Sequence, residues 1–231
     1  MVSATVCNIK QETPSTKSFD LIPLNGKIDF LPGQWIDLFV EIDGRREVAG
    51  YSITSNPSQN PSISLAVKDI GDEFVTRYIH DSMAEGDIVS LGVGGTCTYS
   101  LEKGNTLLLA GGIGITPLIS IFKYIGEDTL HKALIFHSVS SSTEFLLKDE
   151  IKALCSQHPQ RLFYKQTVSG NPKQSNTLGF GRITKDTLQV LSLSYFDTVF
   201  LCGPNSFISD LSACLIDVGF AENQIHFEKW W

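Results

Sequence analysis

The hydrophobic pattern of the chain changes near Lys103, and this change constrains the fold more than any other feature of the sequence. Before Lys103, short segments such as residues 35–41 and 62–68 alternate apolar and polar residues, which is typical of antiparallel strands with one buried face. Turn signals rich in Gly, Pro, Asn and Asp separate these segments, and this spacing predicts a β-barrel or a sandwich. One helix is expected to interrupt the strands, because the apolar residues at 74, 75, 78 and 79 share a helical face.

After Lys103, strand and helix patterns alternate, starting with the continuous apolar run at residues 106–110. The helix that follows this run is expected to use Thr116 as its N-cap and Pro117 as its first residue. Further strands are predicted at residues 133–137, 162–168, 198–202 and 224–228, and helices at 145–155, 184–191 and 205–217. This alternation predicts a doubly wound parallel α/β sheet. We therefore predict two domains, an antiparallel β-barrel at residues 1–103 and an α/β domain at residues 104–231.

The composition excludes several classes of protein. The 231 residues are 42% hydrophobic and 19% charged, which is globular composition and is sufficient for two small cores. A net charge of −7 argues against general nucleic-acid binding, and the longest apolar runs are too short to span a membrane. The five cysteines show neither a disulfide framework nor a metal-ligand spacing, so we expect no metal site. Reduced thiols suit an intracellular location.

A glycine-rich loop follows the first buried strand of the second half. Residues 110–117 read Ala-Gly-Gly-Ile-Gly-Ile-Thr-Pro and enter a helix. Glycines let the backbone approach a ligand closely, and a helix N-terminus offers free N–H groups and the positive end of a dipole. The loop therefore predicts a pyrophosphate site, although a glycine-rich turn without a ligand is the alternative. It is not the usual dinucleotide fingerprint, since Thr116 replaces the third glycine, and no P-loop Lys follows.

Two other segments carry candidate ligand contacts. Residues 201–204 read Leu-Cys-Gly-Pro at the end of a later predicted strand, and ligands of open α/β sheets bind at such strand ends. Cys202 is then a ligand contact, with a buried small hydrophobe as the alternative. In the first half, Tyr51 precedes small hydroxyl residues in a strand, which could stack on a flat ring and bond its polar edge. The alternative there is an ordinary barrel strand.

Together and in this order, the three segments resemble the ferredoxin–NADP reductase superfamily of flavoproteins, over essentially the whole chain. In that family a six-stranded antiparallel barrel holds FAD and a parallel α/β domain holds the nicotinamide dinucleotide. The family's Gly-Gly-x-Gly-x-Thr-Pro motif is complete at residues 111–117, and its Cys-Gly-Pro motif is complete at 202–204. Its Arg-x-Tyr-Ser flavin motif corresponds to residues 49–52. The ending Phe-Glu-Lys-Trp-Trp at 227–231 resembles the subgroup of oxidoreductase NAD-binding domain-containing proteins.

The resemblance implies FAD and NAD or NADP as cofactors, with hydride transfer from NAD(P)H to flavin N5 and electron transfer to an unidentified protein, quinone or small oxidant. It places Ser52 near flavin N5, Cys202 beside nicotinamide C4, and Glu228 close to both rings. The flavin-binding residues that it implies are Tyr51, Ser52, Ile53, Thr54, Val67, Lys68, Gly71, Val75 and Thr76. The residues that it implies for the nicotinamide cofactor are Gly111, Gly112, Gly114, Ile115, Thr116, Pro117, Ser138, Cys202, Gly203 and Pro204. A terminal aromatic residue, Trp230 or Trp231, covers the flavin or packs the C-terminus onto the barrel.

One departure from the family motif concerns the flavin phosphate. The family's Arg is replaced by Ala49, and losing a charge-assisted contact costs about 1.5–3 kcal/mol, roughly ten- to a hundredfold in affinity. We therefore expect FAD to be held weakly. Arg46 is one replacement, although strand alternation turns it to the opposite face, and Lys68 or Arg77 are others. Residues 137–142 offer neither a carboxylate nor an Arg for the ribose, and the absence of Arg favours NAD, while Glu144 and Lys148 nearby leave the choice between NAD and NADP open.

Two other functions are consistent with the same residues. Ala49 favours a flavin-deficient NAD(P)-binding or scaffold protein, and a tight partner would favour an electron-transfer subunit of a larger complex. The subgroup resemblance implies a mitochondrial location, with the cytoplasm as the alternative. The dispersed histidines at 80, 131, 137 and 158 are expected at surface or strand-end positions without a catalytic role. His226 alternates with apolar neighbours and is expected to face outward.

Overall fold

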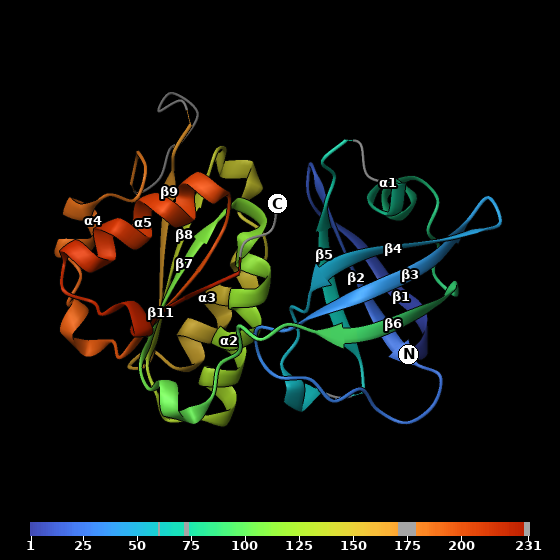
Figure 1. The fold of residues 1–231 in the computed structure, drawn as a ribbon, viewed down its shortest axis with the longest axis horizontal. Helices are drawn as coiled ribbons and strands as arrows, with labels where there is room; N and C mark the ends of the chain where they lie inside the picture. The colour runs from blue at the N-terminus through green and yellow to red at the C-terminus, as the bar shows by residue number, and fades with distance from the viewer. Residues whose placement is uncertain (60, 72–73, 171–178, 229–231) are drawn as a thin grey trace.

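The computed structural model describes residues 1–59, 61–71, 74–170 and 179–228, which form two sheet domains side by side (Figure 1). The first contains an antiparallel sheet of six strands in the order β4-β3-β6-β1-β2-β5. Its strands are β1 Val2–Thr13, β2 Thr16–Pro23, β3 Trp35–Ile42, β4 Arg45–Ser52, β5 Ile63–Lys68 and β6 Ile88–Gly94. This sheet confirms the predicted antiparallel domain.

The interior of the first domain is built from alternate residues of these strands. Phe19, Leu21, Ile36 and Leu38 are almost completely buried there because successive strand residues point to opposite faces. Helix α1, Phe74–Asp81, packs on this interior through its apolar face. The short helix η1 covers Pro57–Gln59. The ends of β4 and β5 and the first turn of α1 lie at the edge that faces the second domain.

The second domain contains a parallel sheet in the order β11-β10-β7-β8-β9, which confirms the predicted α/β fold. Its strands are β7 Thr106–Gly111, β8 Ala133–Val139, β9 Leu162–Val168, β10 Thr198–Cys202 and β11 Ile225–Phe227. Helices α2 Ile115–Asp128 and α3 Lys148–Gln157 cover one face, and α4 Lys185–Gln189 and α5 Asn205–Asp217 cover the other. The chain proceeds from β7 to β8 on one side and later returns to β10 on the other. The strand order therefore reverses between β7 and β10, where open α/β sheets bind ligands.

The start of α2 differs from the prediction. The short helix η3, Gly112–Gly114, runs directly into α2, so that Gly114 occupies the N-cap position and Thr116 lies inside the helix. The Thr116 hydroxyl donates to the Ile113 carbonyl at 2.9 Å and therefore caps no backbone N–H. Likewise α3 begins at Lys148, because η4 at Ser142–Glu144 and a left-handed Leu147 precede it. The other short helices are η2 Leu101–Lys103, η6 Leu193–Tyr195 and η7 Glu222–Gln224.

The domain boundary expected after residue 103 lies between the last strand of the first sheet and the first strand of the second. Helix α2 lies between the parallel sheet and the barrel (Figure 1), and ten of its fourteen residues are buried. Ser120 on α2 donates to the Ser55 carbonyl at 2.7 Å. At the C-terminal end of α2, the Asn56 amide donates to Glu127 at 2.6 Å and to Asp128 at 2.7 Å.

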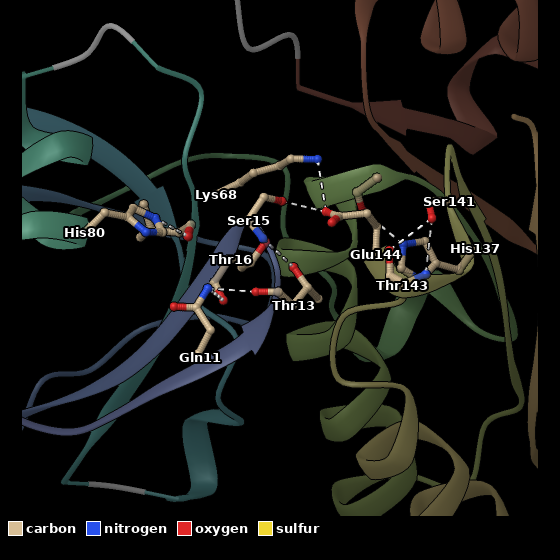
Figure 2. A network of polar contacts seen from close by, with 12 residues as sticks. Gln11, Thr13, Ser15, Thr16, Lys68, His80, His137, Ser141, Thr143 and Glu144 are labelled. Carbon is tan, nitrogen blue, oxygen red and sulfur yellow. Dashed lines mark hydrogen bonds and ion pairs between the residues drawn. The ribbon is translucent and has the colours of Figure 1, made fainter. Parts of the chain in front are cut away.

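A second polar contact joins the domains near α3. Glu144 accepts a hydrogen bond from Ser15 at 2.6 Å and pairs with the Lys68 ammonium at 3.3 Å. Figure 2 shows Lys68 and Ser15 pointing from the barrel toward this carboxylate. Burial alone would raise the pKa of Glu144, but the hydrogen bond from Ser15 and the charge of Lys68 lower it below 4.5. Glu144 is therefore ionised at neutral pH and holds the barrel and the α/β domain together.

Candidate active site

The two domains enclose a cleft of about 1030 Å³ that both of them line. The barrel contributes the ends of β4 and β5 and the first turn of α1, while the α/β domain contributes the carboxyl ends of β7, β8 and β10. Most of the residues predicted from the sequence meet here. Those that line the cleft are Tyr51, Ser52, Val67, Lys68, Val75, Thr76, Gly111, Gly112, Gly114, Thr116, Ser138, Cys202, Gly203 and Pro204.

The two glycine motifs of the α/β domain pack backbone against backbone. A Cβ on Gly114 would overlap the carbonyl group of Cys202, and a Cβ on Gly203 would lie 3.0 Å from the Gly111 Cα. Gly112 adopts a φ of +55°, and a Cβ there would meet no atom within 4 Å. Only glycine permits this approach at Gly114 and Gly203. The result is a backbone cradle at the N-terminal end of α2, which suits a pyrophosphate.

Cys202 forms the floor of the cleft beside this cradle and is 6% exposed. Burial raises the pKa of its thiol to about 12, and the nearby Cys97 and Glu228 add to this effect. The thiol is therefore protonated at neutral pH, which makes it a small apolar surface and not a nucleophile. Glu228 lies outside the cleft lining, and its Oε1 accepts a hydrogen bond from the Thr96 amide at 3.3 Å.

The barrel wall carries one aromatic ring and several hydroxyl groups. Tyr51 at the end of β4 is half-buried, and its hydroxyl lies 3.0 Å from the Thr76 hydroxyl in the first turns of α1. Ser52 follows it at the last position of β4. The small residues Ala49 and Gly50 leave the adjacent wall open. A flat ring with polar edges fits such a wall, because the aromatic face can stack while the hydroxyls bond the edges.

The remaining predicted residues lie elsewhere. Ile53 and Ile115 are fully buried in the two cores, and Thr54 is 3% exposed. Gly71 and Pro117 also lie outside the cleft lining, while Trp230 and Trp231 fall outside the described residues. Arg46 points away from the cleft, because its guanidinium stacks 4.4 Å from the Phe39 ring centroid and contacts Met1 Sδ at 2.7 Å. Arg46 is thus not among the residues that line the cleft, and its role at the flavin phosphate stays a prediction.

Sequence reasoning missed several residues of the site. Arg182 lines the cleft, as do Ser140 and Ser169, which follow β8 and β9. No local pattern reveals this, because Arg182 reaches the site from a segment well beyond β9. Phe207 and Asp210 of α5 also line the cleft. Among the described residues, no group of three His, Cys, Asp or Glu side chains is placed to hold a metal ion.

Two histidines have partners that the sequence does not reveal. His137 is at a strand end as expected, but it is fully buried and its Nε2 lies 3.0 Å from the Gly112 carbonyl oxygen. His226, which was expected to face outward, is half-buried with its ring 5.1 Å from that of Phe200. Its Nε2 lies 2.8 Å from the Lys103 ammonium. Burial and the charge of Lys103 lower the pKa of His226.

Comparisons with known proteins agree with this arrangement. Residues 4–99 match the oxidoreductase FAD-binding domain family, and residues 108–213 match the oxidoreductase NAD-binding domain family. The FAD/NAD-binding domain of nitric oxide dioxygenase from Vibrio cholerae superposes with a TM-score of 0.90 at 22% identity, over 99% of this chain and 98% of that one. A ferredoxin NADP⁺ reductase from Neisseria gonorrhoeae with bound FAD and NADP superposes with a TM-score of 0.80 at 21% identity, over 98% and 97% of the two chains.

The chain thus combines an oxidoreductase FAD-binding domain with an oxidoreductase NAD-binding domain, and its fold is that of the ferredoxin reductase-like proteins. The chain is 32% identical to oxidoreductase NAD-binding domain-containing protein 1 of Danio rerio, over all of this chain and 92% of that protein. It belongs to the family of oxidoreductase NAD-binding domain-containing protein 1. In the described part of the chain, no helix has both the length and the apolar character needed to cross a membrane.

Proposed function

We propose that this chain is an FAD-dependent NAD(P)H oxidoreductase that passes electrons to an acceptor outside the chain. The observation that carries the proposal is the cleft of about 1030 Å³ that both cofactor domains line, from Tyr51 and Ser52 on the barrel to Gly114 and Cys202 on the α/β domain. Hydride transfer requires the reacting atoms to approach within about 3–3.5 Å. Two cofactors can meet this requirement only in a shared cavity. When bound there, FAD supplies a hydride acceptor at N5 and NAD(P)H supplies the hydride at nicotinamide C4.

The residues of the cleft divide between the two cofactors. Gly112, Gly114 and the N-terminal end of α2 hold the pyrophosphate of the dinucleotide, because the backbone approaches closely there and its N–H groups are donors. Tyr51 packs on the flavin and Ser52 bonds its polar edge. Cys202, protonated and small, sets the depth to which the nicotinamide enters. In this scheme the Cys202 thiol takes part in no proton transfer.

Positive charge in the cleft bears on how tightly FAD is held. Ala49 lines the cleft where the family motif has Arg, and the described basic side chains of the lining are Lys68 and Arg182. Lys68 already pairs with Glu144 at 3.3 Å, so a flavin phosphate would compete with this carboxylate for it. We therefore expect FAD to bind more weakly than in proteins that have the Arg, and to dissociate in part during purification.

The test is an absorbance spectrum of the purified chain, with and without added FAD, before and after anaerobic NADH or NADPH. Flavin bands that bleach with one of the nucleotides are expected. Tyr51→Ala should lower FAD uptake, because the stacking ring is lost, whereas the control Tyr51→Phe keeps the ring and should retain most of it. A colourless chain that takes up no FAD but binds NADH would overturn the proposal in favour of a flavin-deficient NAD-binding protein, which Ala49 also favours.

The acceptor is proposed to be a separate molecule. In the Vibrio cholerae protein, the FAD/NAD-binding domain that superposes on this chain is one domain of a nitric oxide dioxygenase. Such a relationship supports a role in which the two cofactor domains deliver electrons to a centre that they do not contain. Rapid reduction of a small oxidant such as ferricyanide by the FAD-loaded chain and NAD(P)H would support this role. Absence of turnover despite flavin bleaching would contradict it.

A further inference from the structure

His137 sits directly beneath the glycine-rich loop and is fully buried. It lies in β8, where the parallel register pairs it with Ala110, the residue before the loop. Its Nε2 is 3.0 Å from the carbonyl oxygen of Gly112. On its other side, Nδ1 is 3.4 Å from the Tyr164 hydroxyl, and the Phe145 ring packs edge-on against the imidazole at a centroid distance of 5.4 Å.

The hydrogen-bond partners define the proton positions on this ring. A carbonyl oxygen can only accept, so Nε2 must carry the proton that Gly112 receives. In the neutral ring Nδ1 is then an acceptor, and the Tyr164 hydroxyl is the donor that faces it. The Gln166 amide in turn donates to the Tyr164 oxygen at 3.1 Å. Burial lowers the pKa of His137 to about 4, so the ring is neutral at physiological pH.

The Gly112 carbonyl oxygen accepts two hydrogen bonds, one from His137 and one from the Ile115 backbone N–H at the start of α2. Gly112 adopts the left-handed φ of +55°, and it begins the turn that leads into α2. The contact turns this carbonyl toward the interior of the domain. A carbonyl oxygen turned into the cleft would instead repel the phosphates of a dinucleotide.

Resting on the proposed function, we propose that His137 is a positioning residue for the nicotinamide dinucleotide. Its Nε2–H holds the Gly112 carbonyl inward so that the backbone N–H groups of the loop face the pyrophosphate. Tyr164 and Gln166 hold the imidazole in the tautomer that can do this. His137 does not touch the reacting atoms, since its side chain is fully buried and Nε2 is already engaged.

The test combines substitutions with two binding measurements on the FAD-loaded full-length chain. His137→Leu keeps about the same volume but removes the imidazole donor and leaves the Gly112 carbonyl with the Ile115 N–H alone. We expect the Kd for NADH to rise roughly two- to tenfold, as for the loss of one net hydrogen bond. The Kd for FAD should not change. His137→Gln places an amide donor near the position of Nε2 and should restore most of the NADH affinity. Tyr164→Phe leaves Nδ1 without its donor and should weaken NADH binding to a smaller extent.

The tautomer provides a readout that does not depend on nucleotide binding. Imidazole ¹⁵N spectra at pH 7 should show His137 as the neutral Nε2–H form, identified by its disappearance in His137→Leu. An Nδ1–H or doubly protonated ring would overturn the proposal, as would equal NADH affinity in wild type and His137→Leu. If His137→Leu does not fold, the other two variants still test the proposal. Unchanged NADH affinity in Tyr164→Phe, together with lost NADH affinity in His137→Gln, would contradict the assigned hydrogen bonds. A wild-type chain that binds no nicotinamide nucleotide would overturn the proposed function and this role together.

In steady-state assays, His137→Leu should raise the KM for NADH more than it lowers kcat. A general loss of packing would instead lower FAD affinity and kcat together. This contrast separates a positioning residue from one that only supports the core. An unaltered KM accompanied by a lower kcat would contradict the assignment.

Discussion

Replacing Gly114 by Ala tests whether the two glycine motifs must touch. The added Cβ would overlap the carbonyl group of Cys202 and lie 2.7 Å from the Gly203 nitrogen. These are backbone atoms and cannot swing aside as a side chain can, so α2 and the 202–204 turn must separate. Overpacking of this kind costs about 1–3 kcal/mol. For a chain of this size, that lowers Tm by roughly 2–12 °C.

The assay is thermal unfolding followed by circular dichroism, with NADH affinity measured by calorimetry at a temperature where the variant is folded. Separation of the two loops should weaken NADH binding even in the folded variant, because the cradle depends on their contact. Gly92→Ala is the matched control, since a Cβ at Gly92 in β6 meets no atom within 4 Å. It should leave both quantities close to wild type. A Gly114→Ala variant with wild-type Tm and wild-type NADH affinity would refute the reasoning.

Other substitutions test the remaining parts of the cleft. Arg182→Ala should weaken NADPH more than NADH by about tenfold or more if Arg182 meets the 2′-phosphate, and equal losses in calorimetric titrations would argue against this. Glu144→Gln should lower the free energy of unfolding at pH 7 by up to about 1 kcal/mol. Because the folded-state pKa of Glu144 is below 4.5, this difference should shrink as the pH falls below that value, which urea titrations at several pH values would show. Ser52→Ala should slow flavin reduction in stopped flow more than it weakens NADH binding, and an unchanged rate would remove Ser52 from the mechanism.

The two sheets could be predicted because their hydrophobic periods differ. β7 is buried at all six positions, whereas β3 alternates, and each pattern is legible in a short window of sequence. The first strand was harder to see. Asn8 adopts a φ of +55° and the register with β2 shifts between Cys7 and Lys10, so the alternation of residues 2–13 is broken.

The glycine loop and the Cys-Gly-Pro turn were also predictable, because their chemistry lies in consecutive residues. The start of α2 was not, since a short helical turn before Ile115 moves the cap from Thr116 to Gly114. Arg182 and His137 depend on contacts between segments far apart in the sequence. The residues next to Arg182 in the sequence do not predict that it lines the same cleft as Ser138. In the same way, a lone histidine at a strand end does not predict a hydrogen bond to the Gly112 carbonyl.

Helix α2 belongs to the core of the α/β domain and also contacts the barrel, and this affects how the protein unfolds on heating. It is about 21 Å long and joins the nucleotide cradle at one end to the Asn56 contacts at the other. Separating the domains would expose Ser120 and its apolar neighbours to water. We therefore expect one heat-absorption peak in calorimetry, because the domains cannot separate without exposing the buried interdomain face of α2. A nucleotide bound at the α/β domain then protects the barrel as well, and FAD that dissociates leaves the nucleotide fold less stable.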